Sequence, residues 1–156
     1  SKKPYVPAME IYLSNDGETN GPIPFKHSLW AFGTAAFLPD GTLLSTFTAN
    51  LEEFPGSVGD PATLTWWNAP ERAEVLAAIR KDPQPIGPTM ARYLAWMKDL
   101  PRVAWERGYG TPDKPAQLVY MGYPGAWDYM WDHWHLMYFT GECPYEHRGK
   151  DIRSYS

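Results

Sequence analysis

Residues 9–24 read MEIYLSNDGETNGPIP, an apolar run that leads into two acids and a turn rich in Gly and Pro. If the run continues as a strand, Asp16 and Glu18 lie on one face, because side chains alternate with a period of two. Neighbouring carboxylates repel each other, and a hard divalent cation such as Mg²⁺ or Mn²⁺ relieves that repulsion. The stretch is therefore compatible with half of a metal site, or with a plain acidic turn between strands, where Asp-Gly is common.

The rest of the chain predicts a mixed α/β domain. Residues 27–38 and 42–49 are rich in apolar and β-branched residues, and Pro39-Asp40-Gly41 between them is typical of a turn. With the first run they predict three antiparallel strands, and the acidic pair lies at one end of these strands. Residues 117–122 predict a further strand.

Several segments have the pattern of helices. Asp60-Pro61 is typical of an N-cap followed by the first helical residue, and residues 70–80 carry apolar positions at helical spacing. Another helix is expected from about residue 87, with its end at Leu100-Pro101, because proline interrupts helices. A strongly aromatic helix is expected at residues 127–139.

The two faces of this aromatic helix differ in character. One face is expected to pack in the core and carries Trp127, Met130, Trp131 and Trp134. The other face is expected either to be solvated or to bind metal, and it carries Asp128, Asp132 and His135. Asp128 lies in the first helical turn, where the helix dipole favours an acid, and a neighbouring strand end would bring it to Asp16 and Glu18. A plain first-turn charge explains Asp128 equally well.

Composition narrows the classes of protein. The length of 156 residues predicts one domain, residues 1–156. The net charge of −4 argues against a broad electrostatic contact with duplex nucleic acid, which needs an excess of Lys and Arg. The single Cys143 excludes an internal disulfide, no apolar run is long enough to cross a membrane, and residues 1–5 lack an apolar signal region. We therefore expect a cytoplasmic protein without a membrane partner.

A series of stretches occurs in the order found in a known enzyme family. The stretches are residues 16–24, the strand after them, Asp60-Pro61 with Trp66-Trp67, residues 122–128, Phe139-Thr140-Gly141 and residues 151–155. The series resembles the ribonuclease T-like branch of the DEDD 3′→5′ exonuclease superfamily, whose first motif is Asp-x-Glu and whose second Asp follows a strand. The resemblance covers nearly the whole chain. It implies an α/β fold of ribonuclease H-like type with helices packed on the sheet, and it makes a homodimer a candidate assembly.

The resemblance also implies a chemistry. Two Mg²⁺ or Mn²⁺ ions would hydrolyse phosphodiesters at the 3′ end of single-stranded RNA or DNA. Asp16 would bridge the two ions, and Glu18 and Asp128 would complete their shells. Terminal bases would stack on tryptophan, because every base has an aromatic face. The candidate substrate-binding residues are Trp66, Trp67, Trp127 and Asp151, although core packing is the favoured explanation for any single Trp.

The sequence departs from the family pattern near residue 156. The family's third motif supplies a general base and a fourth metal-binding Asp from a helix, and this sequence has no counterpart for it. His147 and Asp151 have a base-to-acid spacing but lack the helix, so Asp151 is expected to be a strand-end residue. We therefore expect a domain without the family's C-terminal helical part. Two alternatives stay open: an inactive relative that binds nucleic-acid ends or a protein, and an interaction module whose acidic turn binds nothing.

Overall fold

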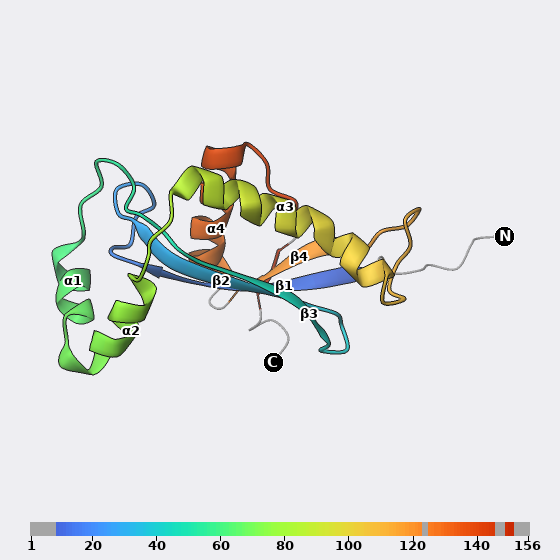
Figure 1. Ribbon diagram of the computed structural model, residues 1–156, viewed down its shortest axis with the longest axis horizontal. Helices are drawn as coiled ribbons and strands as arrows, with labels where there is room; N and C mark the ends of the chain where they lie inside the picture. Colours follow the sequence, from blue (N-terminus) through green and yellow to red (C-terminus); the bar gives the residue numbers. More distant parts are fainter. Residues whose placement is uncertain (1–8, 123–124, 146–148, 152–156) are drawn as a thin grey trace.

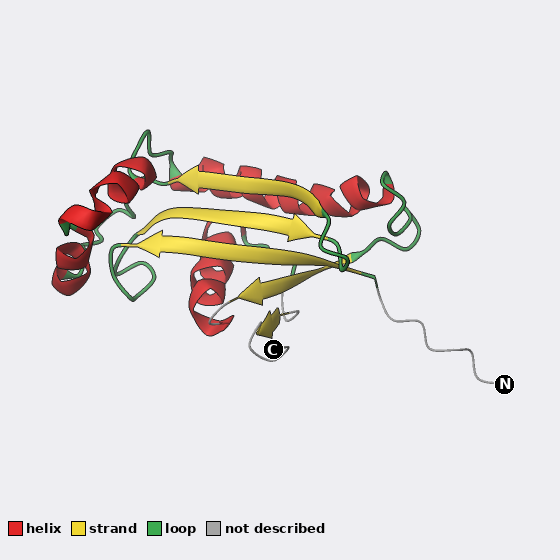
Figure 2. Ribbon diagram, turned by 90° about the horizontal axis from the view of Figure 1, so that it is seen from below, coloured by secondary structure: helices red, strands yellow, loops and turns green. Residues whose placement is uncertain are grey.

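The computed structural model describes residues 9–122, 125–145 and 149–151. Its centre is one five-stranded sheet in the order β3-β2-β1-β4-β5, and the long helices lie on one side of it (Figures 1 and 2). The strands are β1 (Glu10–Thr19), β2 (Leu29–Phe37), β3 (Leu43–Asn50), β4 (Gln117–Gly122) and β5 (Gly149–Asp151). The helices are α1 (Pro61–Trp67), the short 3₁₀ helix η1 (Pro70–Arg72), α2 (Ala73–Ile79), α3 (Ile86–Trp105) and α4 (Gly125–Thr140). The predicted ribonuclease H-like α/β fold, with helices packed on a mixed sheet, is confirmed.

The first three strands form the predicted antiparallel unit. Alternation in β1 buries Ile11 and Leu13 beneath the helices and leaves Asp16 exposed, as a period of two requires. The registers Asp16↔Gly33 and Gly33↔Thr48 run across β1, β2 and β3. The helices α3 and α4 pack on the face that carries the buried side chains, and Figure 2 views the sheet from its other side.

The other edge of β1 pairs with β4 in parallel, and β4 pairs in parallel with β5. The pairing of β1 with β4 ends at Ser14↔Met121, so β1 continues past its partner by several residues. The helix α4 follows β4 closely and begins at Gly125. Because parallel strands end at the same edge of a sheet, the first turn of α4 lies beside the free end of β1.

Two helix predictions were wrong in detail. The predicted end at Leu100-Pro101 does not occur, because α3 continues through Pro101 to Trp105. The lost backbone hydrogen bond is outweighed by packing, since Leu100 and Ala104 on either side of Pro101 are almost fully buried. The predicted helix at residues 70–80 is instead η1 followed by α2. No helix in the described ranges is long and apolar enough to span a bilayer.

The faces of α4 differ in part from the expected arrangement, although Trp131 is buried and Met130 packs against the core as expected. Trp127 and Trp134, expected in the core, are 37% and 52% exposed, whereas Asp128, Asp132 and His135 are at most 5% exposed. The expectation of a solvated acidic face was therefore wrong. The buried acids are stable there because hydrogen-bond donors from other elements reach them, which a helix-face pattern does not reveal.

Candidate functional site

Three carboxylates from two elements gather at the end of β1. Asp16 is exposed and Glu18 is half-buried, and the backbone N–H of Gly17 between them donates to Asp128 Oδ1 at 3.2 Å. Asp128 comes from the first turn of α4 and is 4% exposed. A Cβ atom on Gly17 would lie at an ordinary contact distance of 4.0 Å from Asp128 Oδ1 but only 3.1 Å from Leu29 Cδ1, so the glycine leaves room chiefly for Leu29.

The three acids influence one another electrostatically. Burial raises the pKa of Asp128 to about 6, and the negative charge of Asp16 adds to the rise, while the Gly17 N–H opposes it. Burial also raises the pKa of Glu18, with further contributions from the charges of Asp16 and Asp128. Mutual repulsion of this kind is relieved by a bound cation or by a proton.

The donor chemistry of this cluster fits a hard divalent cation. The side-chain atoms that could coordinate a metal here are all carboxylate oxygens, which Mg²⁺ and Mn²⁺ prefer. Mg²⁺ sites in proteins use one or two carboxylates, and water and phosphate fill the remaining positions. Within residues 9–122, 125–145 and 149–151, no three His, Cys, Asp or Glu side chains are arranged to hold a metal by themselves. A cation at this cluster would therefore take part of its shell from solvent or substrate.

A buried polar network lies one helical turn below Asp128. Asp132 accepts hydrogen bonds from Asn15 Nδ2 at 3.2 Å, from the Tyr93 hydroxyl at 2.9 Å and from the Tyr145 hydroxyl. Asn15 Oδ1 in turn accepts from the Tyr120 hydroxyl at 2.9 Å. The network joins α4 to β1, α3 and β4.

The charge of Asp132 is strongly affected by its surroundings. Burial raises the pKa of Asp132 to about 6, although the Tyr145 and Tyr93 hydroxyls oppose the rise. Burial also raises the pKa of both tyrosines, so they remain protonated donors. The sequence contained a signal for part of this network, because Asn15 falls on the same face as Ile11 and Leu13 and so points inward.

His135 has a structural environment. Its Nδ1 donates to the carbonyl oxygen of Trp131 at 2.8 Å, and its ring stacks on Phe25 with centroids 5.0 Å apart. Burial lowers the pKa of His135 to about 4, so the ring is neutral near pH 7. The predicted alternative of a metal site at Asp132 and His135 has no support, because Asp132 binds Asn15 and two tyrosines while His135 packs between rings.

The other predicted site residues lie on three different elements, with Trp66 and Trp67 in edge-to-face ring contact on α1 at a centroid distance of 4.8 Å. Trp66 is 51% exposed, and the Arg72 guanidinium lies 3.8 Å above its ring. Trp67 is 4% exposed, and its Nε1 donates to the carbonyl oxygen of Thr19 at 2.9 Å. Trp127 is partly exposed beside Asp128.

Asp151 is the last residue of β5, as expected for a strand-end position, and its backbone is in register with Gly122. The side chain of Asp151 and the whole of His147 lie outside the described residues.

Comparisons with known proteins agree with the fold. No protein-family model and no curated protein matches the sequence. Among solved structures, the chain is similar to E. coli exonuclease I in complex with a dA13 oligonucleotide, with a TM-score of 0.59 and 13% identity over 91% of this chain and 27% of that chain. The zinc-bound form of the E. coli exonuclease I complex with single-stranded DNA has a TM-score of 0.58 and 13% identity, over 92% of this chain and 27% of that chain. Cell-death related nuclease 4 has a TM-score of 0.52 and 11% identity, over 86% of this chain and 42% of that chain. The chain thus has the fold of these nucleases and spans about a quarter of the length of exonuclease I.

Proposed function

We propose that this chain is a metal-dependent 3′→5′ exonuclease-like domain of the DEDD type, ribonuclease T-like branch, that acts on the ends of single-stranded RNA or DNA. One observation carries the proposal: Asp128 Oδ1 accepts from the backbone N–H that lies between Asp16 and Glu18. This contact supports a site in which Asp128 joins Asp16 and Glu18 from a distant part of the sequence, in a fold shared with E. coli exonuclease I.

The proposed mechanism assigns a role to each acid. Asp16, the most exposed of the three, would supply the central carboxylate for Mg²⁺ or Mn²⁺, and Glu18 and Asp128 would be the further ligands. Bound ions of this kind activate a water molecule and stabilise the oxygen that leaves the phosphate. The chain itself holds the acids at a rigid strand end and fixes Asp128 through the Gly17 N–H. It therefore supplies preformed negative charge where the cations of a phosphodiester complex are needed.

A second candidate function has its own support. The structural neighbours include E. coli exonuclease I in complex with single-stranded oligonucleotides, which supports a domain that binds nucleic-acid ends without cleaving them. Both functions need the acid cluster to bind a cation, and they differ only in hydrolysis. A homodimer and a cytoplasmic location stay predictions, and light scattering after gel filtration tests the first.

The experiment compares wild-type protein with Asp16→Asn and Asp128→Asn, which remove charge from the cluster and keep side-chain size. The control is Asp113→Asn, which makes the same change in an exposed loop. Mn²⁺ binding is measured by calorimetry, and nucleotide release from a 5′-labelled single strand is followed on a sequencing gel. We expect Mn²⁺ binding and stepwise 3′ shortening in wild type and the control only. Mn²⁺ binding without shortening would favour the second function, and equal Mn²⁺ binding by all four proteins would refute both.

A further inference from the structure

Asn15 is a buried amide that connects β1 to three neighbouring elements, and its side chain is only 7% exposed. Its Nδ2 donates to Asp132 Oδ1 on α4 at 3.2 Å and to Thr34 Oγ1 on β2 at 2.9 Å. Its Oδ1 accepts from the Tyr120 hydroxyl on β4 at 2.9 Å. An amide donates and accepts at the same time, so it serves all three partners together, which neither an apolar side chain nor an ionised carboxylate can do.

A second contact joins α4 to β1 two residues further along the strand. The Gly17 N–H donates to Asp128 Oδ1 at 3.2 Å, while Asn15 is bonded to Asp132. The two contacts are two residues apart on β1, which is about 6.8 Å along a strand, and four residues apart on α4, which is about 6 Å along a helix. Because these spacings match and the order is reversed, α4 runs antiparallel to β1 and contacts it at two points. One contact alone would let the helix pivot, whereas two define its position and its direction.

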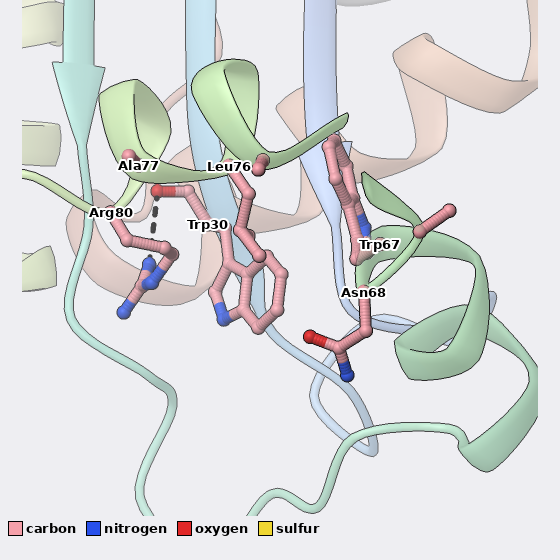
Figure 3. A pocket seen from close by; sticks show the side chains of 8 residues that line it. Trp30, Trp67, Asn68, Leu76, Ala77 and Arg80 are labelled. Atoms are coloured by element: carbon pink, nitrogen blue, oxygen red, sulfur yellow. Dashed lines mark hydrogen bonds between the residues drawn. The ribbon is translucent and has the colours of Figure 1, made fainter. Parts of the chain in front are cut away.

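The acid-bearing end of β1 is itself held in place from another side. The register between β1 and β2 shifts between Glu18 and Thr19, and there Trp67 Nε1 donates to the carbonyl oxygen of Thr19 at 2.9 Å. Figure 3 shows Trp67 near Trp30, with which it lines one pocket, and the two ring centroids are 6.0 Å apart. Since α1 fixes this end of β1, the position of Asp128 depends on how α4 is placed.

The apolar packing of α4 does not by itself define the rotation of the helix. Trp131 and Leu136 are buried, but Trp127 and Trp134 on the same helix are exposed. A helix with large apolar side chains on several sides can bury similar areas in more than one rotation. Buried hydrogen bonds distinguish these rotations, because separating Asn15 from Asp132 would leave unsatisfied polar groups in the core.

We propose that Asn15 and Asp132 are a positioning pair for the acid cluster: their hydrogen bond places α4 along β1 so that Asp128 reaches the Gly17 N–H. Neither side chain of the pair would touch the cation or the substrate. The inference rests on the proposed function for what the acids bind. The placement of Asp128, however, is a property of the metal-free protein and is measured without any ligand.

The first test follows the Gly17 amide in the metal-free protein. Asn15→Leu removes the link and keeps the approximate size of the side chain, whereas the control Tyr93→Phe removes a different hydrogen bond to Asp132, from α3. Amide hydrogen exchange at Gly17 is measured by NMR in EDTA, and urea unfolding gives the part of each rate that is due to global unfolding. We expect local exchange at Gly17 to be about tenfold faster in Asn15→Leu and unchanged in Tyr93→Phe. An unchanged rate in Asn15→Leu, or an equal increase in Tyr93→Phe, would overturn the proposal.

A double-mutant cycle separates positioning from a general loss of core packing. If Asn15 acts through Asp132, then Asp132→Leu should also speed Gly17 exchange about tenfold, and the double variant should exchange no faster than either single variant. Rates that multiply, to about a hundredfold, would show that the two side chains act independently and would overturn the proposal. Asn15→Ala, which has no large side chain to accommodate, takes the place of Asn15→Leu in the cycle if the latter does not fold.

Cation binding is measured separately by calorimetry with Mn²⁺. We expect Asn15→Leu to bind Mn²⁺ about tenfold more weakly than wild type and Tyr93→Phe to bind it equally well, because only the first change displaces Asp128. Where wild type binds Mn²⁺, an unchanged affinity in Asn15→Leu would overturn the role of the pair in the site. A wild-type protein that does not bind Mn²⁺ would refute the proposed function, and Gly17 exchange would still decide whether the pair positions Asp128.

Discussion

Replacing Asp132 with asparagine tests the electrostatics of the network beneath the acid cluster. Burial raises the pKa of Asp132 from 3.8 to about 6, so between these values the folded state binds a proton that the unfolded chain has released. The stability that this group contributes is full below about pH 3.8 and is lost as the pH rises through about 6. Asparagine keeps the shape of the side chain but cannot ionise.

The magnitude follows from the difference in proton affinity. Each tenfold change in affinity is worth about 1.4 kcal/mol, so Asp132 lowers the unfolding free energy by about 3 kcal/mol from acid to neutral pH. His135 acts in the opposite direction. Burial lowers the pKa of His135 from 6.5 to about 4, so its contribution is present above about pH 6.5 and is lost as the pH falls through about 4. The two effects nearly cancel in the wild-type protein.

The assay is urea unfolding, followed by tryptophan fluorescence, at several pH values from about 4 to about 7. We expect the unfolding free energy of Asp132→Asn, relative to wild type, to increase by about 2 kcal/mol as the pH rises from about 4 to about 7, because part of the full change lies below pH 4. Asp128 and His135 are present in both proteins, so their contributions largely cancel from the difference. A difference that is constant with pH would refute the raised pKa. A difference that decreases with pH would show that the tyrosine and asparagine donors outweigh burial.

Three other changes have defined expectations. Tyr93→Phe removes the hydroxyl that is hydrogen-bonded to both Thr34 and Asp132. It should lower the free energy of unfolding in urea by about 1 to 3 kcal/mol, because buried polar groups lose a partner. An unchanged midpoint of the urea unfolding curve would contradict this. Mn²⁺ at a hundred times its dissociation constant should stabilise the wild-type protein by about 2.7 kcal/mol. In differential scanning fluorimetry, the same Mn²⁺ concentration should leave the melting temperature of Asp128→Asn unchanged. Equal Mn²⁺-induced shifts in the melting temperatures of the two proteins would exclude Asp128 as a ligand. Pro101→Ala should raise the melting temperature, because alanine restores a backbone donor within α3, and a lower value would show that the proline ring packs favourably.

The parts of the fold that the sequence predicts well are those with a clean local period. The alternation of Ile11, Leu13 and the residues after them identified β1, and Asp60 was correctly identified as an N-cap, since its Oδ2 accepts from the Thr63 N–H at 3.0 Å. In both cases, the physical cause of the structure lies within a few residues.

The parts that were missed depend on distant partners. The burial of Asp132 and His135 on α4 depends on Tyr93 of α3, Asn15 of β1 and the ring of Phe25, none of which lies near α4 in sequence. Because α4 has large apolar side chains on several sides, its spacing alone does not reveal which face is buried. The contact of Asp128 with Gly17 likewise depends on the sheet order, which a single sequence does not fix.

The parallel pairing of β1 with β4 also determines when the acids meet during synthesis. The first three strands are neighbours in sequence and can form a hairpin-linked unit early, whereas Gly17 and Asp128 are 111 positions apart in the chain. Contacts over such separations form late, because the intervening chain must first be ordered. We therefore expect nascent chains to carry Asp16 and Glu18 in a folded unit that cannot complete the cluster. Docking of α4 is then the step that brings Asp128 to the two acids of β1.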